Sequence, residues 1–426
     1  MRLNKALLTT AVVLSLAVAG CSGGSSNGGA AESGPVTLSY GVWDQNQVPA
    51  LKQVIANFEK TNKNIKVKIQ VTPYDQYFTK LQAAATGGAA PDVFWMNGPN
   101  FQLYASNGVL APISDQIKKD GLDTSVYPKS LVDLYSLDGK QYALPKDFDT
   151  IGLWYNKKLF DDAGVKYPDA TWTWTDLQDA AAKLTNKSKG IYGIPASLEG
   201  QQNFYNTILQ AGGHVLSADG KSSGYDDPAT IKGLSFWTDL IKSGSSPSLK
   251  QMTDTLPLQW FESGKAAMFY GGSWNVIEFK KNEYTADKID VAPLPKGEKQ
   301  GVVIHGLGNV ISAKTKHSDA AWQFVKYLME PAQNVEIVLS GGGRPALRSS
   351  VLDNDRLMKE MKAHKCFAPF IKSAEPWKQP ANYRWAEFNA TVLQVFADLW
   401  LGKQTVDQAI ADAKPKFQAI LDKPVA

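Results

Sequence analysis

Two glycines followed by a tryptophan form the most distinctive short pattern in the chain. In the stretch AMFYGGSWNV, residues 267–276, an apolar run is interrupted by Gly271 and Gly272, and Trp274 follows two residues later. A phosphate-binding loop would place backbone N–H groups before a helix, usually with a lysine. Here a large flat ring follows instead. Because a buried indole offers apolar area and a directional face, Trp274 predicts a platform for a ligand, with a core tryptophan as the alternative.

Two carboxylates lie close together in the stretch PKDFDT, residues 145–150. Asp147 and Asp149 are two residues apart, and along an extended segment such residues share a face. An ionised carboxylate accepts two hydroxyl hydrogen bonds in a fixed plane, which suits vicinal diols. We therefore expect both residues to point into a binding cleft, with a turn-capping role as the alternative.

Three more strand ends carry groups that bind ligands. They are VWDQN, FWMNGPN and IHGLGN, and the candidate contacts in them are Trp43, Asp44, Gln45, Asn97, His305 and Gly306. A neutral imidazole is a good hydroxyl partner, whereas Trp95 is expected in the core. In open α/β sheets, ligands bind beyond the carboxyl ends of the strands. Five such ends gathered on one cleft would make a wide site of planar faces and hydrogen-bonding groups.

The elements that must position these residues follow a strand–helix rhythm at the start of the chain. Apolar periodicity predicts strands over 36–44, 65–74 and 91–97, with helices over 48–62 and 75–88 between them. This order favours the α/β class with a mainly parallel sheet.

Later segments repeat the pattern in other proportions. An extended stretch and short helix occupy 142–165, and Thr173 or Thr175 caps a helix within 171–185. We further predict strands within 264–276 and 288–297, a strand followed by a helix within 308–330, and mostly helices from about Ser349 onward, at 356–364, 385–402 and 405–421.

The first 34 residues predict export rather than folded structure. Residues 1–20 combine a basic start with a short apolar run, as in a secretory signal peptide. Cys21, after small residues, resembles the lipidated cysteine of a bacterial lipobox. Residues 21–34 are rich in Gly and Ser, which makes a flexible tether of roughly 20 Å. We therefore expect a protein lipid-anchored to the outer face of the cell membrane.

The remaining chain of about 390 residues is longer than one hydrophobic core usually serves, so two domains are expected. Removing Arg2 and Lys5 with the signal lowers the net charge from +4 to +2, too little to favour nucleic acid. Cys366 would be the only cysteine besides Cys21, so no disulfide within the chain and no cysteine-based metal site are expected. Four scattered histidines lack metal-ligand spacing, and we expect neither metal nor cofactor.

The order of several stretches resembles the extracellular solute-binding proteins of ABC importers, in particular the carbohydrate-binding family that includes maltose-binding protein. The similarity runs from about Val36 to the C-terminus. It rests on LKQVIANFEKTNKNIKVKIQ, KLQAAATGGAAPDVFWMN, ALPKDFDTIGLWYNKKLFDDAGV, FESGKAAMFYGGSWNV, the segment from APLPKG to HGLGNVISAKTKHSDAAWQFVKYL, and GGGRPALRSS.

The resemblance implies a two-lobed periplasmic-binding-protein-like fold with a hinge between the lobes and a ligand cleft. Lobe 1 would comprise 35–147 and 304–348, and lobe 2 would comprise 148–303 and 349–426. Such a protein captures an oligosaccharide by hinge closure, performs no chemistry, and delivers the sugar to membrane permease subunits. We expect it to be a monomer.

The resemblance also implies roles for individual residues. Trp274 would lie flat under a sugar ring, with the glycines letting it approach the backbone, and Asp149 matches the family's cleft carboxylate. Trp43, Asp44 and Gln45 stand where the family commonly contacts sugar, although Gln45 replaces a lysine found there in some members. Lobe 2 offers Glu199, Gln202, Asn203, Tyr383 and Trp385, the last approximately at a stacking position, while Arg344 is expected to be structural.

Two other function classes stay open at this point. A secreted hydrolase would need two carboxylates at a defined separation, and Asp147 and Asp149 are too close in the chain to be convincing. A second alternative is a binding protein for iron, phosphate, polyamine or peptide. An iron site would need clustered Tyr or His, and an anion site would rely on Ser and backbone N–H groups. Tryptophans and amides at strand ends favour a sugar. Whether a carbohydrate is consumed or only bound would distinguish the first alternative.

Overall fold

A computed structural model describes residues 34–127, 129–330, 333, 344–345, 376–377 and 384–423. The chain divides into two compact units, Met1–Gly34 and Pro35–Ala426, and the described residues belong to the second apart from Gly34. The predicted signal peptide, Cys21, Cys366 and Tyr383 lie outside the described residues.

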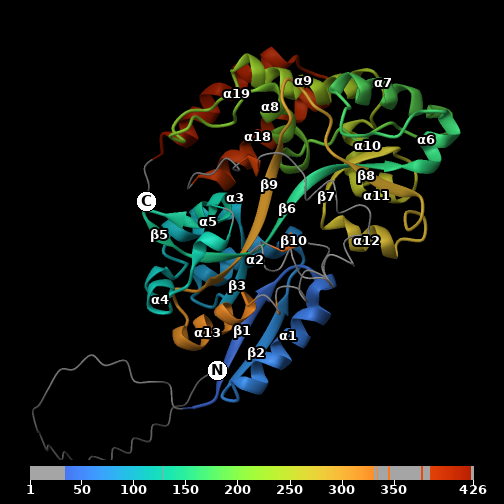
Figure 1. The fold of residues 1–426 in the computed structure, drawn as a ribbon. Helices are drawn as coiled ribbons and strands as arrows, with labels where there is room; N and C mark the ends of the chain where they lie inside the picture. Colours follow the sequence, from blue (N-terminus) through green and yellow to red (C-terminus); the bar gives the residue numbers. More distant parts are fainter. Residues whose placement is uncertain are drawn as a thin grey trace, which may run out of the picture. The chain divides into compact units, whose positions relative to one another are not determined.

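The N-terminal strands form the parallel part of the fold (Figure 1). Strand β1 (Val36–Val42) pairs in parallel with β2 (Ile65–Val71) on one side and with β3 (Val93–Asn97) on the other. Helices α1 (Val48–Thr61) and α2 (Tyr74–Thr86) connect these strands, and α1 buries its predicted apolar face. The predicted rhythm is confirmed here, with element ends shifted by a few residues.

Apart from a short parallel pairing of β11 (Pro376–Trp377) with Val302 and Val303, the rest of the sheet is antiparallel, so the prediction of a mainly parallel sheet is wrong beyond the first three strands. Strand β9 (Val302–Ile311) lies between β3 and the long strand β6 (Ala143–Asn156) and is antiparallel to both. Strands β7 (Met268–Gly272) and β8 (Ile289–Ala292) also run antiparallel to β6. The strand–helix alternation that favours parallel pairing is local to the N-terminus, whereas these later strands meet through long-range contacts.

Strands β6 and β9 connect two separate hydrophobic cores. Leu144 in β6 and Ile311 in β9 pack with β1–β3 and the helix at 318–328. Toward their other ends, Leu153 in β6 and Val303 in β9 pack in the second core with the C-terminal helices. Two extended strands are thus shared between two packed bodies, which is the arrangement of a hinged two-lobed α/β protein. The lobe boundaries given above stay a prediction.

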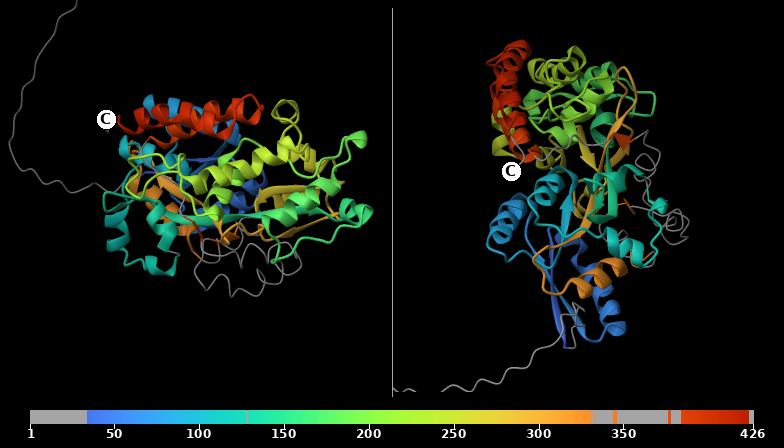
Figure 2. Two further views of the ribbon diagram at one scale, coloured as in Figure 1. Left: turned by 90° about the horizontal axis from the view of Figure 1, so that it is seen from above. Right: turned by 90° about the vertical axis from the view of Figure 1, so that its left-hand side faces the viewer.

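The remaining helices and strands surround these cores (Figures 1 and 2). They are α3 (Gly98–Ser106), α4 (Ser114–Lys119), α5 (Lys129–Leu134), β4 (Ser136–Leu137), β5 (Lys140–Gln141), α6 (Lys157–Ala163), α7 (Trp174–Leu184), α8 (Tyr205–Ala211), α9 (Pro228–Lys242), α10 (Leu249–Asp254), α11 (Pro257–Glu262), α12 (Asn275–Lys281), α13 (Ser318–Leu328), β10 (Arg344–Pro345), β11 (Pro376–Trp377), α18 (Trp385–Trp400) and α19 (Val406–Leu421). Thr173, not Thr175, caps α7, and Asp176 bonds back to its N–H in a capping box. Helices α18 and α19, red in Figure 2, pack through aromatic contacts such as Phe388–Phe417, with ring centroids 5.1 Å apart.

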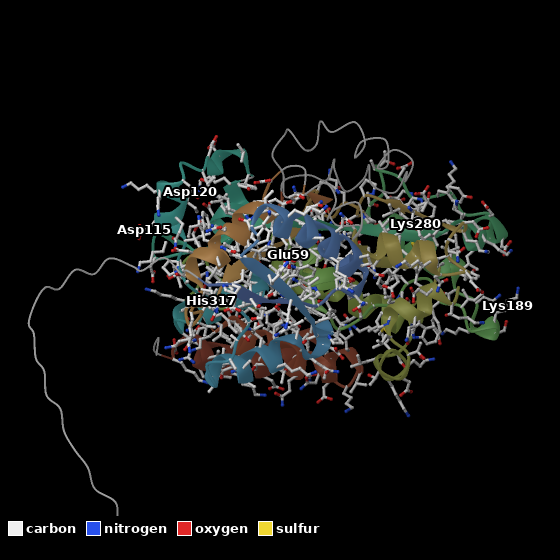
Figure 3. The ribbon with its side chains drawn as sticks, turned by 90° about the horizontal axis from the view of Figure 1, so that it is seen from below. Glu59, Asp115, Asp120, Lys189, Lys280 and His317 are labelled. Carbon is white, nitrogen blue, oxygen red and sulfur yellow. The ribbon has the colours of Figure 1, made fainter. Side chains whose placement is uncertain are left out.

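Charged side chains of both signs lie on the outside of the helices and loops. Figure 3 shows Glu59 on α1, Asp115 and Asp120 at α4, and Lys189 and Lys280 farther along the surface. Within the described ranges, no helix has the length and apolar character needed to cross a membrane.

Candidate functional site

Trp274 lies directly against the backbone of Gly272. Strand β7 ends at Gly272 and helix α12 begins at Asn275, so Trp274 occupies the connection between them. A Cβ atom on Gly272 would stand 2.0 Å from a carbon of the Trp274 ring, and one on Gly271 would stand 2.5 Å from the Phe269 ring. Both distances are far below van der Waals contact. The predicted steric role is therefore confirmed for Gly272, where only a residue without a side chain admits the Trp274 ring, whereas Gly271 makes room for Phe269 instead.

Trp274 lines a cavity of about 380 Å³ together with two other predicted contacts, Gln202 and Asn203. The remaining lining residues are Ser197, Leu198, Glu199, Leu249, Met252, Leu256, Pro257, Leu258, Phe269 and Asn275. This volume is in the range of small-molecule binding sites. The structure thus brings together residues that are more than 70 positions apart in the sequence.

The polar wall of the cavity is built at the start of a short π-helix, Gly200–Phe204. The Glu199 carboxylate accepts the backbone N–H groups of Gln201 at 3.0 Å and Gln202 at 2.5 Å. Desolvation nevertheless raises the pKa of Glu199 to about 7, against the opposing effect of these hydrogen bonds. Asn203 accepts the Ser197 hydroxyl at 3.0 Å on Oδ1. This wall therefore presents amides and a carboxyl group that is partly protonated at neutral pH.

Asn275 completes the polar wall and is absent from the sequence-based set of contacts. It is only 4% exposed, and its side-chain carbonyl Oδ1 accepts no hydrogen bond from the described residues. The aliphatic residues of α10 and the segment before α11 are also absent from that set. Asn275 follows Trp274 directly in the motif, so its position in the sequence could have identified it as a residue that lines the cavity. The aliphatic residues have no such signal in the sequence.

Trp43 belongs to an aromatic cluster around the first core. Its ring contacts those of Tyr74, Tyr77 and Trp95 with centroid distances of 5.5, 4.9 and 5.1 Å. Trp95 is fully buried, as predicted. Trp43 itself is half-buried, so part of its surface remains open beside that core.

Asp44 and Gln45 follow Trp43 at the start of a 3-10 turn, Gln45–Gln47. Asp44 accepts the Asn46 N–H at 2.8 Å and the Gln47 side-chain amide at 2.9 Å. Gln45 is exposed. The Asp44 carboxylate thus has a capping role in the structure.

Asn97 and Tyr74 are linked at the end of β3. Asn97 caps α3 by accepting the Asn100 N–H, and its Nδ2 donates to the Tyr74 hydroxyl at 3.1 Å. Tyr74 is 51% exposed, so its ring is accessible to a ligand. Desolvation around the hydroxyl, and then the charge on Glu199, raise the pKa of Tyr74 to about 12.

Asp147 is held in a buried network rather than presented to a cleft. It is 3% exposed and forms an ion pair with Lys146, which also donates to Gln47 Oε1 at 3.1 Å. Asp147 also accepts the Leu307 N–H at 3.3 Å, and burial raises its pKa although the Lys146 charge opposes this. A register shift between Pro145 and Asp147 interrupts the pairing of β6 with β9.

The other predicted contacts on these strands are placed by their backbone. Asp149 stands opposite His305 in the β6–β9 register. Both residues lie inside long strands, Ala143–Asn156 and Val302–Ile311, so the expectation that these two stretches end strands is wrong. The structure describes no more than the backbone of these two residues. Gly306 is buried against Leu131, and its carbonyl accepts the Tyr135 hydroxyl at 2.5 Å.

Trp385 is not among the residues that line the cavity. Trp385 is 3% exposed at the start of α18 and packs against Tyr205 and Phe388 with centroid distances of 5.8 and 5.7 Å. Arg344 pairs with Phe148 in a short antiparallel bridge beside β6. The environment of Trp385 is that of a core residue.

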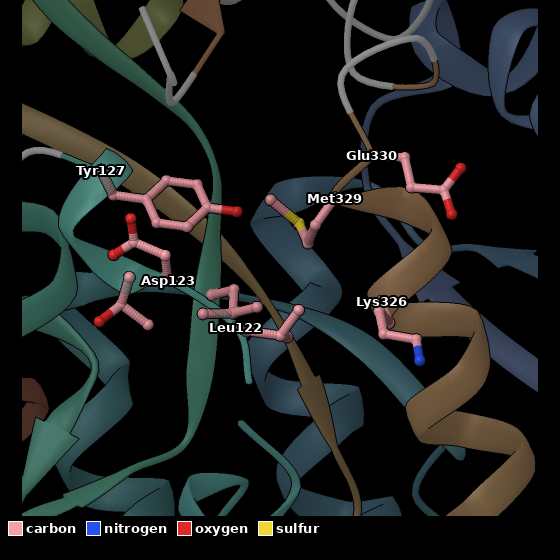
Figure 4. Close-up of a pocket in the computed structure, with 8 residues that line it drawn as sticks. Leu122, Asp123, Tyr127, Lys326, Met329 and Glu330 are labelled. Atoms are coloured by element: carbon pink, nitrogen blue, oxygen red, sulfur yellow. The ribbon is translucent and has the colours of Figure 1, made fainter. Parts of the chain in front are cut away.

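Two further hollows contain none of the predicted contacts. One, of about 210 Å³, lies between Tyr127, Leu122 and the end of α13 (Figure 4). The other, of about 680 Å³, shares Lys326 and Glu330 with it and extends to α1. Neither includes a strand end of the candidate site. Within the described residues, no group of three His, Cys, Asp or Glu side chains is arranged to hold a metal ion.

Comparison with known proteins supplies a family and several similar structures. The family model described as bacterial extracellular solute-binding protein matches residues 44–335 of this chain. A galactooligosaccharide-binding protein of Bacillus subtilis is 25% identical over 425 residues, which cover 97% of this chain and 96% of that protein. A diacetylchitobiose binding protein of Streptomyces coelicolor is 26% identical over 331 residues, covering 75% and 76%.

The fold is likewise similar to that of a solved structure. An ABC substrate-binding protein from Listeria monocytogenes in complex with cycloalternan aligns with a TM-score of 0.80 and 27% identity, covering 91% of this chain and all of that one. The similarity therefore extends over nearly the whole second unit.

Proposed function

The chain belongs to the bacterial extracellular solute-binding protein family, and from this premise we propose that it captures an oligosaccharide for an ABC importer. The observation that carries the proposal is the cavity in which Trp274, Gln202, Asn203 and Glu199 meet. An aromatic face beside amide and carboxyl groups suits a sugar ring, which has an apolar C–H face and a hydroxyl edge.

In this proposal Trp274 stacks on one sugar ring while the polar wall orients its hydroxyl groups. The amides of Gln202 and Asn203 offer both donors and acceptors, and the carboxyl group of Glu199 does so when protonated. Tyr74 and the open part of Trp43 provide contacts from the first core. No step breaks a covalent bond, so binding energy alone is used.

Ligand binding is proposed to favour closure about β6 and β9, the strands shared between the two cores. A membrane permease that prefers the closed form would then detect occupancy as a population shift. Relatives support carbohydrate as the ligand class, since their names specify galactooligosaccharide and diacetylchitobiose, and the Listeria protein holds cycloalternan.

The family is extracytoplasmic, and we propose a lipid anchor for this member. Residues 1–20 would be removed as a signal peptide, and Cys21 would carry the lipid at the end of the 21–34 tether. We also propose that the protein is a monomer. Fractionation of cells that express the Cys21→Ser variant tests the anchor: the variant should leave the membrane fraction, and its retention there would contradict lipidation.

The proposed function is tested by isothermal titration of the purified protein against a panel of oligosaccharides, followed by chromatography of the sugar. We expect saturable binding of at least one oligosaccharide, with the sugar recovered unchanged. Shortened products would establish a hydrolase instead. An absence of binding across the panel would contradict the sugar assignment.

A further inference from the structure

Helix α8 is buried on all sides and still carries polar side chains. Each of its residues, Tyr205–Ala211, is buried, and Asn206, Thr207 and Gln210 are 0% exposed. Burying an amide or a hydroxyl group costs free energy unless its hydrogen bonds are made. The partners of these side chains therefore show which segments the polar groups hold together.

The amide of Asn206 uses all of its hydrogen-bonding groups. Its Nδ2 donates to the backbone carbonyls of Gln201 at 3.1 Å and Gln202 at 2.9 Å, and its Oδ1 accepts the backbone N–H of Val303 at 2.9 Å. A hydroxyl group has only one hydrogen to donate, and an apolar side chain has neither donor nor acceptor. The amide thus joins the π-helix Gly200–Phe204 to the start of β9.

The two segments that Asn206 joins belong to different parts of the proposed mechanism. The π-helix carries Gln202 and Asn203, which line the cavity. Strand β9 has Val303 in the second core and Ile311 in the first, so it is shared between the two. π-Helices are rare and are often found at functional sites. A wall of the cavity is therefore bonded through one buried side chain to a strand that connects the cores.

We propose that Asn206 is a positioning residue for ligand binding, which holds Gln202 and Asn203 in place by fixing the π-helix against β9. Asn206 is not among the residues that line the cavity, so it acts through its neighbours rather than by touching a sugar. The inference rests on the proposed function, because it assigns a role within oligosaccharide capture. A wall that is already fixed before the sugar arrives loses less conformational freedom on binding, which favours affinity.

Gln210 provides a matched comparison on the same helix. It is as buried as Asn206 and lies one turn farther from the π-helix. Its Nε2 donates to the Gly301 carbonyl at 2.9 Å, and its Oε1 accepts the Trp174 indole N–H at 2.8 Å. Neither partner lines the cavity. Removal of this amide should therefore reduce stability without displacing the polar wall.

Titration calorimetry of the purified protein compares Asn206→Leu with Gln210→Met. The probe is the sugar that binds the unmodified protein most tightly in an oligosaccharide panel that includes galactotriose, maltotriose and diacetylchitobiose. We expect Asn206→Leu to weaken binding about tenfold and Gln210→Met to change it less than about twofold. Both variants should lower the midpoint of thermal unfolding, so lost stability alone does not account for the difference. Asn206→Ser, which keeps one hydroxyl donor, replaces Asn206→Leu if that variant fails to fold, and it should weaken binding at least about threefold.

A double-mutant cycle distinguishes positioning from a general effect on the fold. Gln202→Ala removes one side chain through which Asn206 is proposed to act. When Asn206→Leu is added to Gln202→Ala, we expect the further loss of affinity to be at least about threefold smaller than the loss that Asn206→Leu causes alone. Gln210→Met combined with Gln202→Ala should show no such coupling.

The other outcomes contradict the inference. Unchanged affinity in the Asn206 variant would overturn it, and so would equal weakening by the Asn206 and Gln210 variants, which would reduce Asn206 to a stabilising role. Additive effects of Asn206→Leu and Gln202→Ala would likewise overturn it. Each of these results leaves sugar binding by the unmodified protein intact. If the unmodified protein binds no sugar of the panel, the proposed function fails and the role of Asn206 fails with it.

Discussion

The tryptophans Trp43 and Trp274 occur in similar sequence contexts and have different surroundings in the structure. Each follows a strand and stands near small or polar residues. Trp43 is surrounded by the rings of Tyr74, Tyr77 and Trp95, which make it part of a core. Trp274 instead lies over Gly272 and forms the wall of a cavity. Both rings are partly buried against a core, and what distinguishes them is that Trp274 also lines the cavity, whereas Trp43 has other rings as its neighbours.

The acidic residues of the two regions differ in the same way. Asp147, beside the first core, is paired with Lys146 and 3% exposed. Glu199, beside the second, has no cationic partner among its hydrogen bonds and lines the cavity, and desolvation raises its pKa to about 7. A paired carboxylate stabilises structure, whereas an accessible one without a cation is available to a ligand. We therefore propose that the second region is mainly a binding surface and the first mainly structural.

The largest effect is expected from breaking the ion pair of the first region. Lys146→Met leaves the Asp147 carboxylate buried without its cation, and we expect a loss of about 3–5 kcal/mol in the free energy of unfolding. Chemical denaturation measures it. Lys129→Met, which removes an exposed ion pair with Asp133, is the control and should change stability by less than about 1 kcal/mol. Equal effects would show that the Lys146–Asp147 pair is not a structural element.

Substitution of Trp274 should mainly affect ligand binding, whereas substitution of Trp43 should mainly affect the stability of the fold. Trp274→Ala is expected to weaken oligosaccharide binding about 100-fold and change the unfolding midpoint little, because the ring faces a cavity. Trp43→Ala should lower the free energy of unfolding by about 2–3 kcal/mol through lost ring packing. Titration calorimetry and thermal unfolding of both variants give the comparison.

A backbone variant checks the same assignment. Gly272→Ala should displace the Trp274 ring and weaken binding about tenfold, whereas Gly87→Ala should have no effect on binding, since a Cβ there meets atoms only at 3.5 Å or beyond. Unchanged affinity in both Trp274→Ala and Gly272→Ala would remove Trp274 from the site.

The raised pKa of Glu199, which lies in the second region, predicts that the stability of the protein depends on pH. Its pKa is about 7 in the folded protein and 4.5 by reference, so between these values the folded state holds a proton that the unfolded chain has lost. The free energy of unfolding should therefore fall as pH rises from about 4.5 to about 7. Denaturation at several pH values, compared with Glu199→Gln, isolates the contribution, because glutamine does not titrate. Parallel profiles for the two proteins would contradict it.

The smallest effect is expected where the two regions touch at the surface. Lys281 at the end of α12 donates to Asn46 Oδ1 at 2.8 Å, and both residues are exposed. Lys281→Met should change ligand affinity no more than about threefold, because exposed contacts of this kind contribute little. Lys242→Met, on α9, is the control. A tenfold change in ligand affinity in the Lys281 variant alone would show that this contact stabilises the ligand-bound closed form.

Local elements were predictable from the sequence because their signals are local. Helix α1 and strand β2 follow from apolar spacing, and the capping box at Thr173 follows from residues three positions apart. The steric role of Gly272 also follows from the motif, since the ring that needs its space is only two residues away. The antiparallel part of the sheet was not predictable in this way. Its register joins β6 to β9 across more than 150 residues, and no short pattern records that pairing.

By itself, the sequence determined the α/β class, the family resemblance and the importance of the GGSW motif. All three depend on residue order and neighbouring side chains. Only the tertiary structure decided which polar and aromatic residues are available to a ligand. It buried Asp147 in a network with Lys146 and Leu307, and it brought Trp274 together with Gln202 and Asn203 around one cavity. Accessibility is a property of packing between distant segments, so the same residue types form a core in one region and a binding wall in the other.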